Sequence, residues 1–429
     1  MTSLLRLRTW GGPVLSVIVA LCFTISPCLA PPSTSWTEDK EDDAGSGPTS
    51  SQKTKGSGKV DRVSGALTGV SSFRAMIQDE EDVFVVWVAD PEAFQASLRS
   101  TDNGSASFDA SLYLFTPDTT VVDELFVFNE MFGLLGVQDV QQLGALLPAV
   151  ATDSTGVLVT EPGYYMLAVS SATRYPTILL GGFALPIFSF ISGSEVSGPD
   201  GDAGSLAFTE TEGFWEGTPA TGFYDVALDG VGFAFPSRSP GNDALPTDAY
   251  VEEGVWPIYT SMASTESQAD VTCVSPDGTG QVLHHDLWWS YEPVEPGLIR
   301  VSTCDRVDFD SVIAVYLEKR PCRGDINSDG VVDVVDFSVL MVQWDSSGPE
   351  ADLNGDGTVD INDFSLFLIY FGSCQPDLEL VACQDDSTAC AAGTSEVFFT
   401  TDGTEKFLIR IGGPGSGDRG RGTFSVKYD

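Results

Sequence analysis

Two acidic segments of the sequence repeat one spacing of oxygen-bearing residues. The pattern Asp-x-Asn-x-Asp-Gly-x-x-Asp-x-x-Asp starts at Asp325 and again at Asp352, 27 positions later (352 − 325). Calcium takes six to eight oxygen ligands, and a 12-residue loop supplies them from positions 1, 3, 5, 7, 9 and 12, with glycine at position 6 for the sharp turn. The sequence therefore predicts two calcium ions, held by Asp325, Asn327, Asp329, Val331, Asp333 and Asp336, and by Asp352, Asn354, Asp356, Thr358, Asp360 and Asp363.

A helical spacing of apolar residues follows each acidic segment. These residues stand at i, i+3, i+4 and i+7 in both copies: Phe337, Leu340, Met341 and Trp344, then Phe364, Phe367, Leu368 and Phe371. The spacing predicts a short amphipathic helix after each loop. Residues 320–324, before the first loop, carry no such pattern, so each unit is a loop followed by one helix.

This duplicated unit, from Arg323 to Ser373, resembles the type I dockerin module. The resemblance implies two bound calcium ions, antiparallel packing of the two helices and docking to a cohesin partner. Dockerins usually carry small hydroxyl residues at loop positions 10 and 11, which contact cohesin. This chain has Val334-Val335 and Ile361-Asn362 there. A purely structural calcium clamp is the alternative role.

The charge balance restricts the partners. The chain of 429 residues has 62 acidic and 21 basic residues, a formal net charge of −41. Such a surface repels nucleic acid and anionic lipid, because binding to phosphate needs clusters of Lys and Arg. A hydrophobic content of 42% nevertheless predicts folded cores, in two or three domains.

The first 58 residues contain two segments outside these domains. Residues 1–30 have a basic start, an apolar core and a small-residue exit, which predicts a secretory signal peptide and a secreted or cell-surface protein. No later apolar run reaches the length that a membrane span needs. Residues 31–58 are rich in Pro, Ser, Thr, Gly and charge, which predicts a disordered linker.

Six cysteines remain after residue 30, and an even count in an exported chain favours disulfides. Fifteen pairings are possible. Cys322 and Cys374 flank the dockerin-like unit, and the antiparallel packing that the resemblance implies would bring them together. We therefore predict three bonds: Cys322 with Cys374, Cys383 with Cys390 and, by elimination, Cys273 with Cys304.

The rest of the chain reads as short apolar runs bounded by Gly, Pro, Asp and Asn, which is typical of β-sandwiches. We expect a mainly β fold with two jelly-roll-like β-sandwich domains, the second interrupted by a small all-α module. The expected boundaries are residues 59–236 for the first domain, 237–321 plus 375–429 for the second, and 322–374 for the module. Residues 123–150 are Leu-rich, and we expect a helical insertion there, with an exposed partner-binding patch as the alternative.

Both β domains are similar to the bacterial pre-peptidase C-terminal domain of secreted planctomycete-type proteins. The first copy shows this in residues 108–115, 162–170 and 224–228. The second shows it in residues 285–291, 296–304, 309–316, 380–386 and 406–413. The resemblance implies two β-sandwich domains. Separately, no barrel or cleft fold of catalytic size is apparent in the sequence, because small sandwiches and a docking module leave little room for one.

Three further groups could do chemistry. His284 and His285 are the only candidate bases for a nucleophilic triad, but no nucleophile motif accompanies them. Trp288, Trp289 and Tyr291 could stack on a sugar, although strand alternation places at least half of them in a core. Asp385-Asp386 could bind a further calcium ion, but we expect a solvated turn there.

We therefore expect a secreted, non-catalytic calcium-binding protein for extracellular adhesion or assembly, with the dockerin-like module as docking site or structural joint. The expected partner is a cohesin-like or other extracellular protein. The alternative is a component of extracellular polysaccharide catabolism, either a glycoside hydrolase accessory or a carbohydrate-binding protein.

Overall fold

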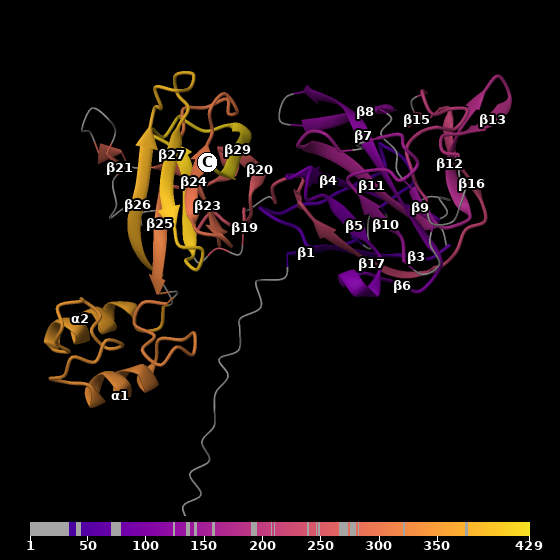
Figure 1. The fold of residues 1–429 in the computed structure, drawn as a ribbon. Helices are drawn as coiled ribbons and strands as arrows, with labels where there is room; N and C mark the ends of the chain where they lie inside the picture. The colour runs from indigo at the N-terminus through magenta and orange to yellow at the C-terminus, as the bar shows by residue number, and fades with distance from the viewer. Residues whose placement is uncertain are drawn as a thin grey trace, which may run out of the picture. The chain divides into compact units, whose positions relative to one another are not determined.

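The computed structural model describes residues 34–39, 44–69, 79–122, 125–133, 138–140, 144–156, 159–189, 195–206, 208–209, 211–237, 240–245, 247, 249–265, 273–274, 280–281, 283–320, 322–373 and 376–429. The predicted signal segment 1–30 lies outside them. The fold is mainly β, as expected, with two α-helices among the described residues (Figure 1). In this part of the chain no helix has the length and apolarity to cross a membrane.

Two sheets of the N-terminal half pack face to face, and we call them the first sheet pair. The six-stranded sheet contains β1 (Ser35–Thr37), β3 (Arg62–Leu67), β17 (Gly222–Asp229), β5 (Gln95–Ser97), β10 (Leu146–Pro148) and β6 (Ser105–Ala106). The nine-stranded sheet contains β14 (Val196–Ser197), β9 (Gln138–Val140), β7 (Ala110–Val122), β11 (Gly163–Ser171), β4 (Glu81–Val88), β18 (Val231–Phe233), β2 (Gln52–Lys53), β8 (Leu125–Gly133) and β15 (Phe208–Thr209). One 3₁₀ turn, η1 (Ser100–Asp102), follows β5.

Strand alternation explains why the central strands of the nine-stranded sheet are apolar on both faces. In β4, Phe84 and Val86 join the core shared with the six-stranded sheet, while Val83 and Val85 join a second cluster on the opposite face. Successive side chains of a strand point to opposite faces, so both faces of β4 are buried. The second cluster is covered by a three-stranded sheet of β13 (Phe183–Pro186), β12 (Arg174–Leu180) and β16 (Gly213–Gly217).

The Leu-rich segment 123–150 is not the expected helical insertion. Its described residues form β8, which pairs with β7, then β9 and β10. Pairing with existing strand edges satisfies the backbone hydrogen bonds of this segment, and this tertiary contact overrides its partial helical spacing. The alternative of an exposed patch over residues 123–150 stays a prediction, because the structure does not describe the side chains of residues 123–143.

The expected disordered linker over residues 31–58 also differs from the structure, for residues 34–39 and 44–58. There β1 runs parallel to β3, and β2 runs parallel to β4. Thr54 is buried, and its hydroxyl donates to the carbonyl oxygen of Val85 at 2.7 Å. Free edges of neighbouring strands supply hydrogen-bond partners, so a segment with few apolar residues is nevertheless ordered.

The C-terminal half forms a second sheet pair. Its five-stranded sheet contains β19 (Tyr250–Val251), β23 (His284–Tyr291), β28 (Phe407–Gly413), β25 (Val312–Arg320) and β26 (Asp377–Asp385). Its four-stranded sheet contains β20 (Gly254–Tyr259), β29 (Arg421–Tyr428), β24 (Gly297–Ser302) and β27 (Glu396–Thr401). A small hairpin of β21 (Cys273–Val274) and β22 (Gly280–Gln281) and the 3₁₀ turn η2 (Thr260–Met262) complete this half.

The aromatic residues of β23 are packed inside the protein. Trp289 and Tyr291 lie in the core between the two sheets, while Trp288 lies in a smaller cluster on the opposite face of the five-stranded sheet. All three side chains are buried. A sugar cannot stack on buried rings, so the carbohydrate platform considered for these residues is wrong.

Residues 322–373, which we call the inserted module, connect two paired strands of the second sheet pair. β25 and β26 run antiparallel from Val312 opposite Asp385 to Arg320 opposite Asp377. The chain therefore leaves and re-enters the sheet on neighbouring strands. Arg323, at the start of the module, lies 3.5 Å from Asp377 and donates to the carbonyl oxygen of Leu353 at 3.3 Å.

The inserted module contains α1 (Val334–Val342) and α2 (Ile361–Tyr370). Leu340 and Phe367 are the buried centre of its small core, and the Phe337 ring lies 5.7 Å from that of Phe364. Met341 and Leu368, which helical spacing predicts on the same face, are exposed instead. The core of so small a module is narrow, so only part of each apolar stripe is covered.

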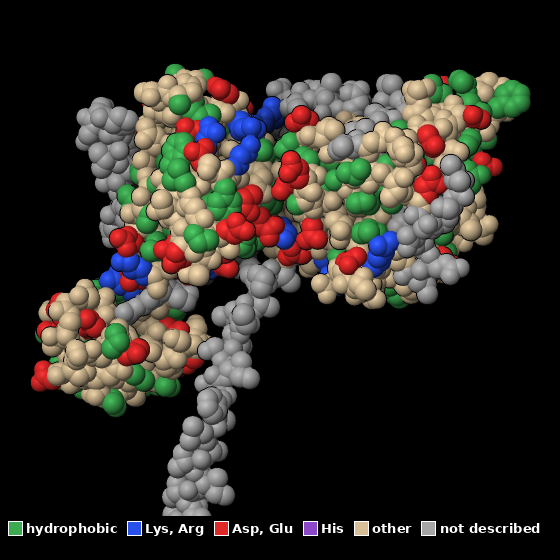
Figure 2. All heavy atoms as spheres, viewed as in Figure 1, with side chains coloured by type: hydrophobic (Ala, Val, Ile, Leu, Met, Phe, Trp, Pro, Cys, Tyr) green, Lys and Arg blue, Asp and Glu red, His purple; other side chains and the backbone are tan. Residues whose placement is uncertain are grey.

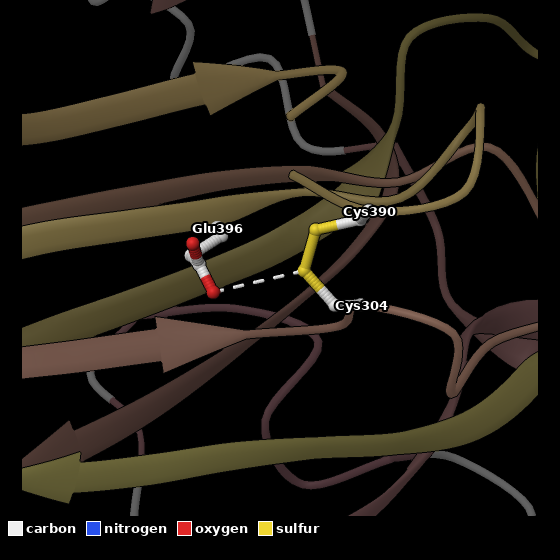
Figure 3. A group of neighbouring side chains, drawn as sticks. All are labelled: Cys304, Cys390 and Glu396. Atoms are coloured by element: carbon white, nitrogen blue, oxygen red, sulfur yellow. Dashed lines mark hydrogen bonds between the residues drawn. A yellow bond between two sulfur atoms is a disulfide. The ribbon is translucent and has the colours of Figure 1, made fainter. Parts of the chain in front are cut away.

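One disulfide joins Cys304 and Cys390 (Figure 3). The predicted pairs of Cys273 with Cys304 and Cys383 with Cys390 are therefore wrong. Strand β24 ends beside the loop that follows β26, and this proximity could not be read from cysteine spacing. Cys322 and Cys383 each take part in a disulfide bond as well. The prediction that Cys322 pairs with Cys374 stays a prediction, because Cys374 lies outside the described residues.

Removing the Cys304–Cys390 bond should destabilise the second sheet pair. The bond closes a sequence separation of 86 residues, and a disulfide of this kind typically contributes about 2–4 kcal/mol. We expect the double variant Cys304→Ser/Cys390→Ser to lose that amount in urea unfolding. Non-reducing peptide mapping checks the pairing directly, and a peptide linking Cys383 to Cys390 would contradict it.

Candidate metal centre

The first acidic loop is held in shape by its own backbone amides. The two carboxylate oxygens of Asp325 accept from the backbone amides of Asp329 at 3.1 Å and Gly330 at 2.7 Å. Asp336 is buried, and its Oδ1 accepts from the backbone amides of Ile326 at 2.8 Å and Asn327 at 3.0 Å. The aspartates at the first and last ligand positions thus hold the loop in a closed shape through hydrogen bonds to its backbone.

The second loop repeats most of this pattern, although Asp352 Oδ1 accepts from the amide of Gly355 at position 4, whereas Asp325 Oδ1 accepts from the amide at position 5. Asp352 accepts from the backbone amide of Gly357 at 2.8 Å, in the place of Asp325. Asp363 is buried and accepts from the backbone amides of Leu353 at 2.8 Å and Asn354 at 3.0 Å, in the place of Asp336. Two segments with the same residue types at the same positions therefore reach nearly the same local structure.

The glycine at position 6 of each loop has the backbone conformation that the sequence pattern requires. Gly330 has φ of 88° and Gly357 has φ of 89°. L-residues with a Cβ rarely adopt this conformation, whereas glycine does so at little steric cost. The sharp turn brings the side chains of positions 1, 3 and 5 to one side of the loop.

Positions 9 and 12 connect each loop to its helix. Asp333 caps α1 by accepting from the backbone amide of Val335 at 2.7 Å, and Asp336 accepts from the backbone amide of Asp333 at 2.8 Å. Asp360 and Asp363 form the same reciprocal capping box at the start of α2. The predicted ligands therefore also fix where each helix begins.

The donor atoms fit a hard divalent cation. Side-chain oxygens of Asp325, Asp329 and Asp336 all lie within 4.8 Å of one another. The second loop has the same residue types at the equivalent positions, Asp352, Asp356 and Asp363. Unit charges 4 Å apart repel by about 4 kcal/mol at an effective dielectric of 20. Oxygen-only ligands that repel one another suit calcium or magnesium rather than zinc or copper.

The outer faces of the two helices carry apolar side chains at equivalent positions. Val334 and Ile361 are exposed at position 10 of each loop. Val342 and Ile369, eight residues further on in each copy, are 85% and 69% exposed. The helical spacing read from the sequence did not include these four residues. The one sequence signal that could have revealed this stripe is its repetition at 27-residue spacing, which keeps the outward positions apolar in both copies.

A second group of carboxylates lies in the second sheet pair. Side-chain oxygens of Asp310, Asp385 and Asp386 lie within 4.8 Å of one another. Burial, together with the nearby carboxylates of Asp386 and Asp418, raises the pKa of Asp310. Asp386 is exposed and accepts from the backbone amide of Gly393 at 2.9 Å. Acidic side chains often gather without a metal, so the calcium ion considered for Asp385 and Asp386 stays a prediction.

Cys304, Cys390 and Glu396 also come together, with Cys304 Sγ 3.7 Å from Glu396 Oε2 (Figure 3). Metal binding by cysteine requires the thiolate. Because both sulfur atoms are in a disulfide, this group lacks the thiolate donors that a metal site would need. Glu396 instead forms an ion pair with Arg300.

His285 is part of the scaffold. His285 Nδ1 lies 2.7 Å from the carbonyl oxygen of Ala263, and Nε2 lies 3.1 Å from the carbonyl oxygen of Ser416. Both ring nitrogens therefore face backbone carbonyl groups, as in a side chain that connects loops.

Comparison with models of known protein families and with curated protein sequences finds no match to this chain. The residues of the loops and helices therefore carry the functional argument.

Proposed function

We propose that the inserted module is a calcium-dependent docking module in a non-catalytic protein of extracellular adhesion or assembly. In this proposal each loop binds one calcium ion through the predicted ligand set, and the outward helix faces bind a cohesin-like protein. Bound calcium would neutralise the loop carboxylates and hold both helix starts in place.

The observation that carries the proposal is the repetition of the whole arrangement. In both copies the acid at position 12 accepts three backbone hydrogen bonds, the glycine at position 6 has a positive φ, and the helix starts at position 10. A chance cluster of surface acids would not reproduce buried carboxylates and capping boxes twice. A hard cation accounts for all these features together.

The exposed helix faces support docking over a purely structural role. Exposed apolar side chains gathered on one surface often mark a site of protein interaction. The outward residues of α1 and α2 are Val334, Val335, Met341, Val342, Ile361, Leu368 and Ile369. A module that served only as a clamp would have no need for them.

Titration calorimetry with purified type I cohesin domains tests this proposal. We expect binding in calcium that is absent in chelator, and a loss of at least about tenfold in affinity for the variant Val342→Asp/Ile369→Asp. Charge in a buried apolar contact costs more than the 1.4 kcal/mol that tenfold represents. Val294→Asp, at an exposed apolar position outside the module, is the matched control and should bind normally.

Tight calcium binding without any cohesin binding would contradict the docking role and favour the structural joint. A structural joint would use the same two calcium sites. Arg323 contacts Asp377, Leu353 and the ring of Tyr370, and so connects the module to β26.

The finer assignment of the fold belongs to the same proposal. We infer that both sheet pairs are β-sandwich domains resembling the pre-peptidase C-terminal domain, and that the chain is secreted. In support, each pair of sheets encloses one large apolar cluster, and strands that are distant in sequence contribute to it.

A further inference from the structure

The hairpin of β12 and β13 ends in large exposed apolar side chains. Leu179 and Leu180 end β12 and are each 48% exposed, and Phe183, which opens β13, is 73% exposed. Figure 1 shows this hairpin at one end of the first sheet pair, and Figure 2 shows apolar side chains gathered at that end. These three large apolar side chains are exposed and therefore do not contribute to the hydrophobic core.

The tip is built as a fixed structure. Leu180 pairs with Phe183, and Leu179 pairs with Ala184. The two connecting glycines, Gly181 and Gly182, have φ of 60° and 86°, as a type I′ turn requires at both central positions. At the base of the hairpin, Ile178 is buried in the apolar cluster beneath. The strand ladder thus holds the three side chains outward.

Charge is absent from the whole segment that contains the tip. Residues 175–194 include no Asp, Glu, Lys, Arg or His, although 19% of the chain is charged. The exposed acids Glu212 and Glu216 lie just before β16 and within it, and β16 pairs with β12 of the hairpin. Burial of the tip in an apolar environment therefore desolvates no charged side chain. The acidic side chains beside the tip repel anions.

The small size of the tip favours a lipid surface over a second copy of the chain as its binding partner. A stable protein interface takes about 800 Å² and 20–30 residues from each partner. Three side chains on a convex tip are far fewer. A lipid surface needs no matching shape, and apolar residues of an anchored element enter the boundary between headgroups and acyl chains. We propose that this tip inserts into the interfacial region of a lipid surface with zwitterionic headgroups.

Flotation of the purified protein with phosphatidylcholine vesicles, in saturating calcium, tests the proposal. We expect the wild type to float with the vesicles and Leu180→Ser/Phe183→Ser to lose at least about tenfold in partitioning. All three tip positions are exposed, so the variant should stay folded. Phe223→Ser is the matched control, because Phe223 is 77% exposed on β17, away from the tip; it should float as the wild type does.

Three outcomes would overturn the lipid site. The wild type could fail to float, Phe223→Ser could lose as much as the tip variant, or the tip variant could float unchanged. Sedimentation velocity without vesicles addresses the other occupant, since self-association abolished by the tip variant would assign the surface to a second copy. Vesicles with anionic headgroups should bind less protein at low salt, because the chain carries a net charge of −41.

Discussion

Removal of calcium should unfold the inserted module and leave both sheet pairs intact. Without a cation, the carboxylates of each loop repel one another, and Asp336 and Asp363 stay buried as charged acceptors of backbone amides. A ligand at a hundredfold excess over its Kd contributes about 2.7 kcal/mol per site. Two sites together therefore rival the stability of a small domain. Hydrogen exchange with mass spectrometry should show rapid exchange across residues 325–370 in chelator and unchanged protection in β23 and β28.

Variants separate the metal effect from general destabilisation. Asp336→Ala and Asp363→Ala should each reproduce the chelator result even in calcium, because each removes a ligand and the acceptor of three backbone hydrogen bonds. Glu350→Ala changes an exposed acid between the loops and should leave protection unchanged. Helices α1 and α2 that keep their protection in chelator would show that the loops fold without a cation.

Asp286→Ala should destabilise the second sheet pair by about 3–5 kcal/mol, the usual cost of breaking a buried ion pair. Arg410 Nε donates to Asp286 Oδ2 at 2.7 Å, and both side chains are almost fully buried. The Arg410 guanidinium also lies 4.8 Å from the ring of Trp288. Removal of the carboxylate leaves a buried cation whose remaining contacts are the Tyr316 hydroxyl and the Trp288 ring, and both are neutral. Urea unfolding followed by tryptophan fluorescence measures the loss.

Two controls test whether the loss comes from an unpaired buried charge at the Arg410–Asp286 ion pair. Arg410→Met/Asp286→Leu should recover most of the stability, because two apolar residues of similar volume leave no charge unpaired. Lys319→Ala breaks the ion pair with Glu379, in which both side chains are about half exposed, and should leave the unfolding transition unchanged. An Asp286→Ala variant as stable as the wild type would mean that water reaches Arg410.

Predictions from the sequence succeeded where the physics is local. Alternating apolar residues predict strands, and the chain is mainly β. Helices follow both acidic segments at Val334 and Ile361, because the acid at position 9 caps each of them. The predictions that failed concern contacts between distant segments. Residues 125–133 became a strand because β7 offered an edge, and Cys304 met Cys390 because β24 ends beside the loop after β26.

The sequence by itself determined the local geometry of the two acidic loops, because all the groups that shape a loop lie within 12 residues. Side-chain oxygens, backbone amides and the glycine at position 6 meet there without help from the rest of the chain. Only the tertiary structure decided which side of each helix faces water, since Leu340 and Met341 are equally apolar and differ only in what covers them. The exposed tip of β12 and β13 likewise depended on the sheet beneath it, because an apolar run reads as core until its neighbours in space are known.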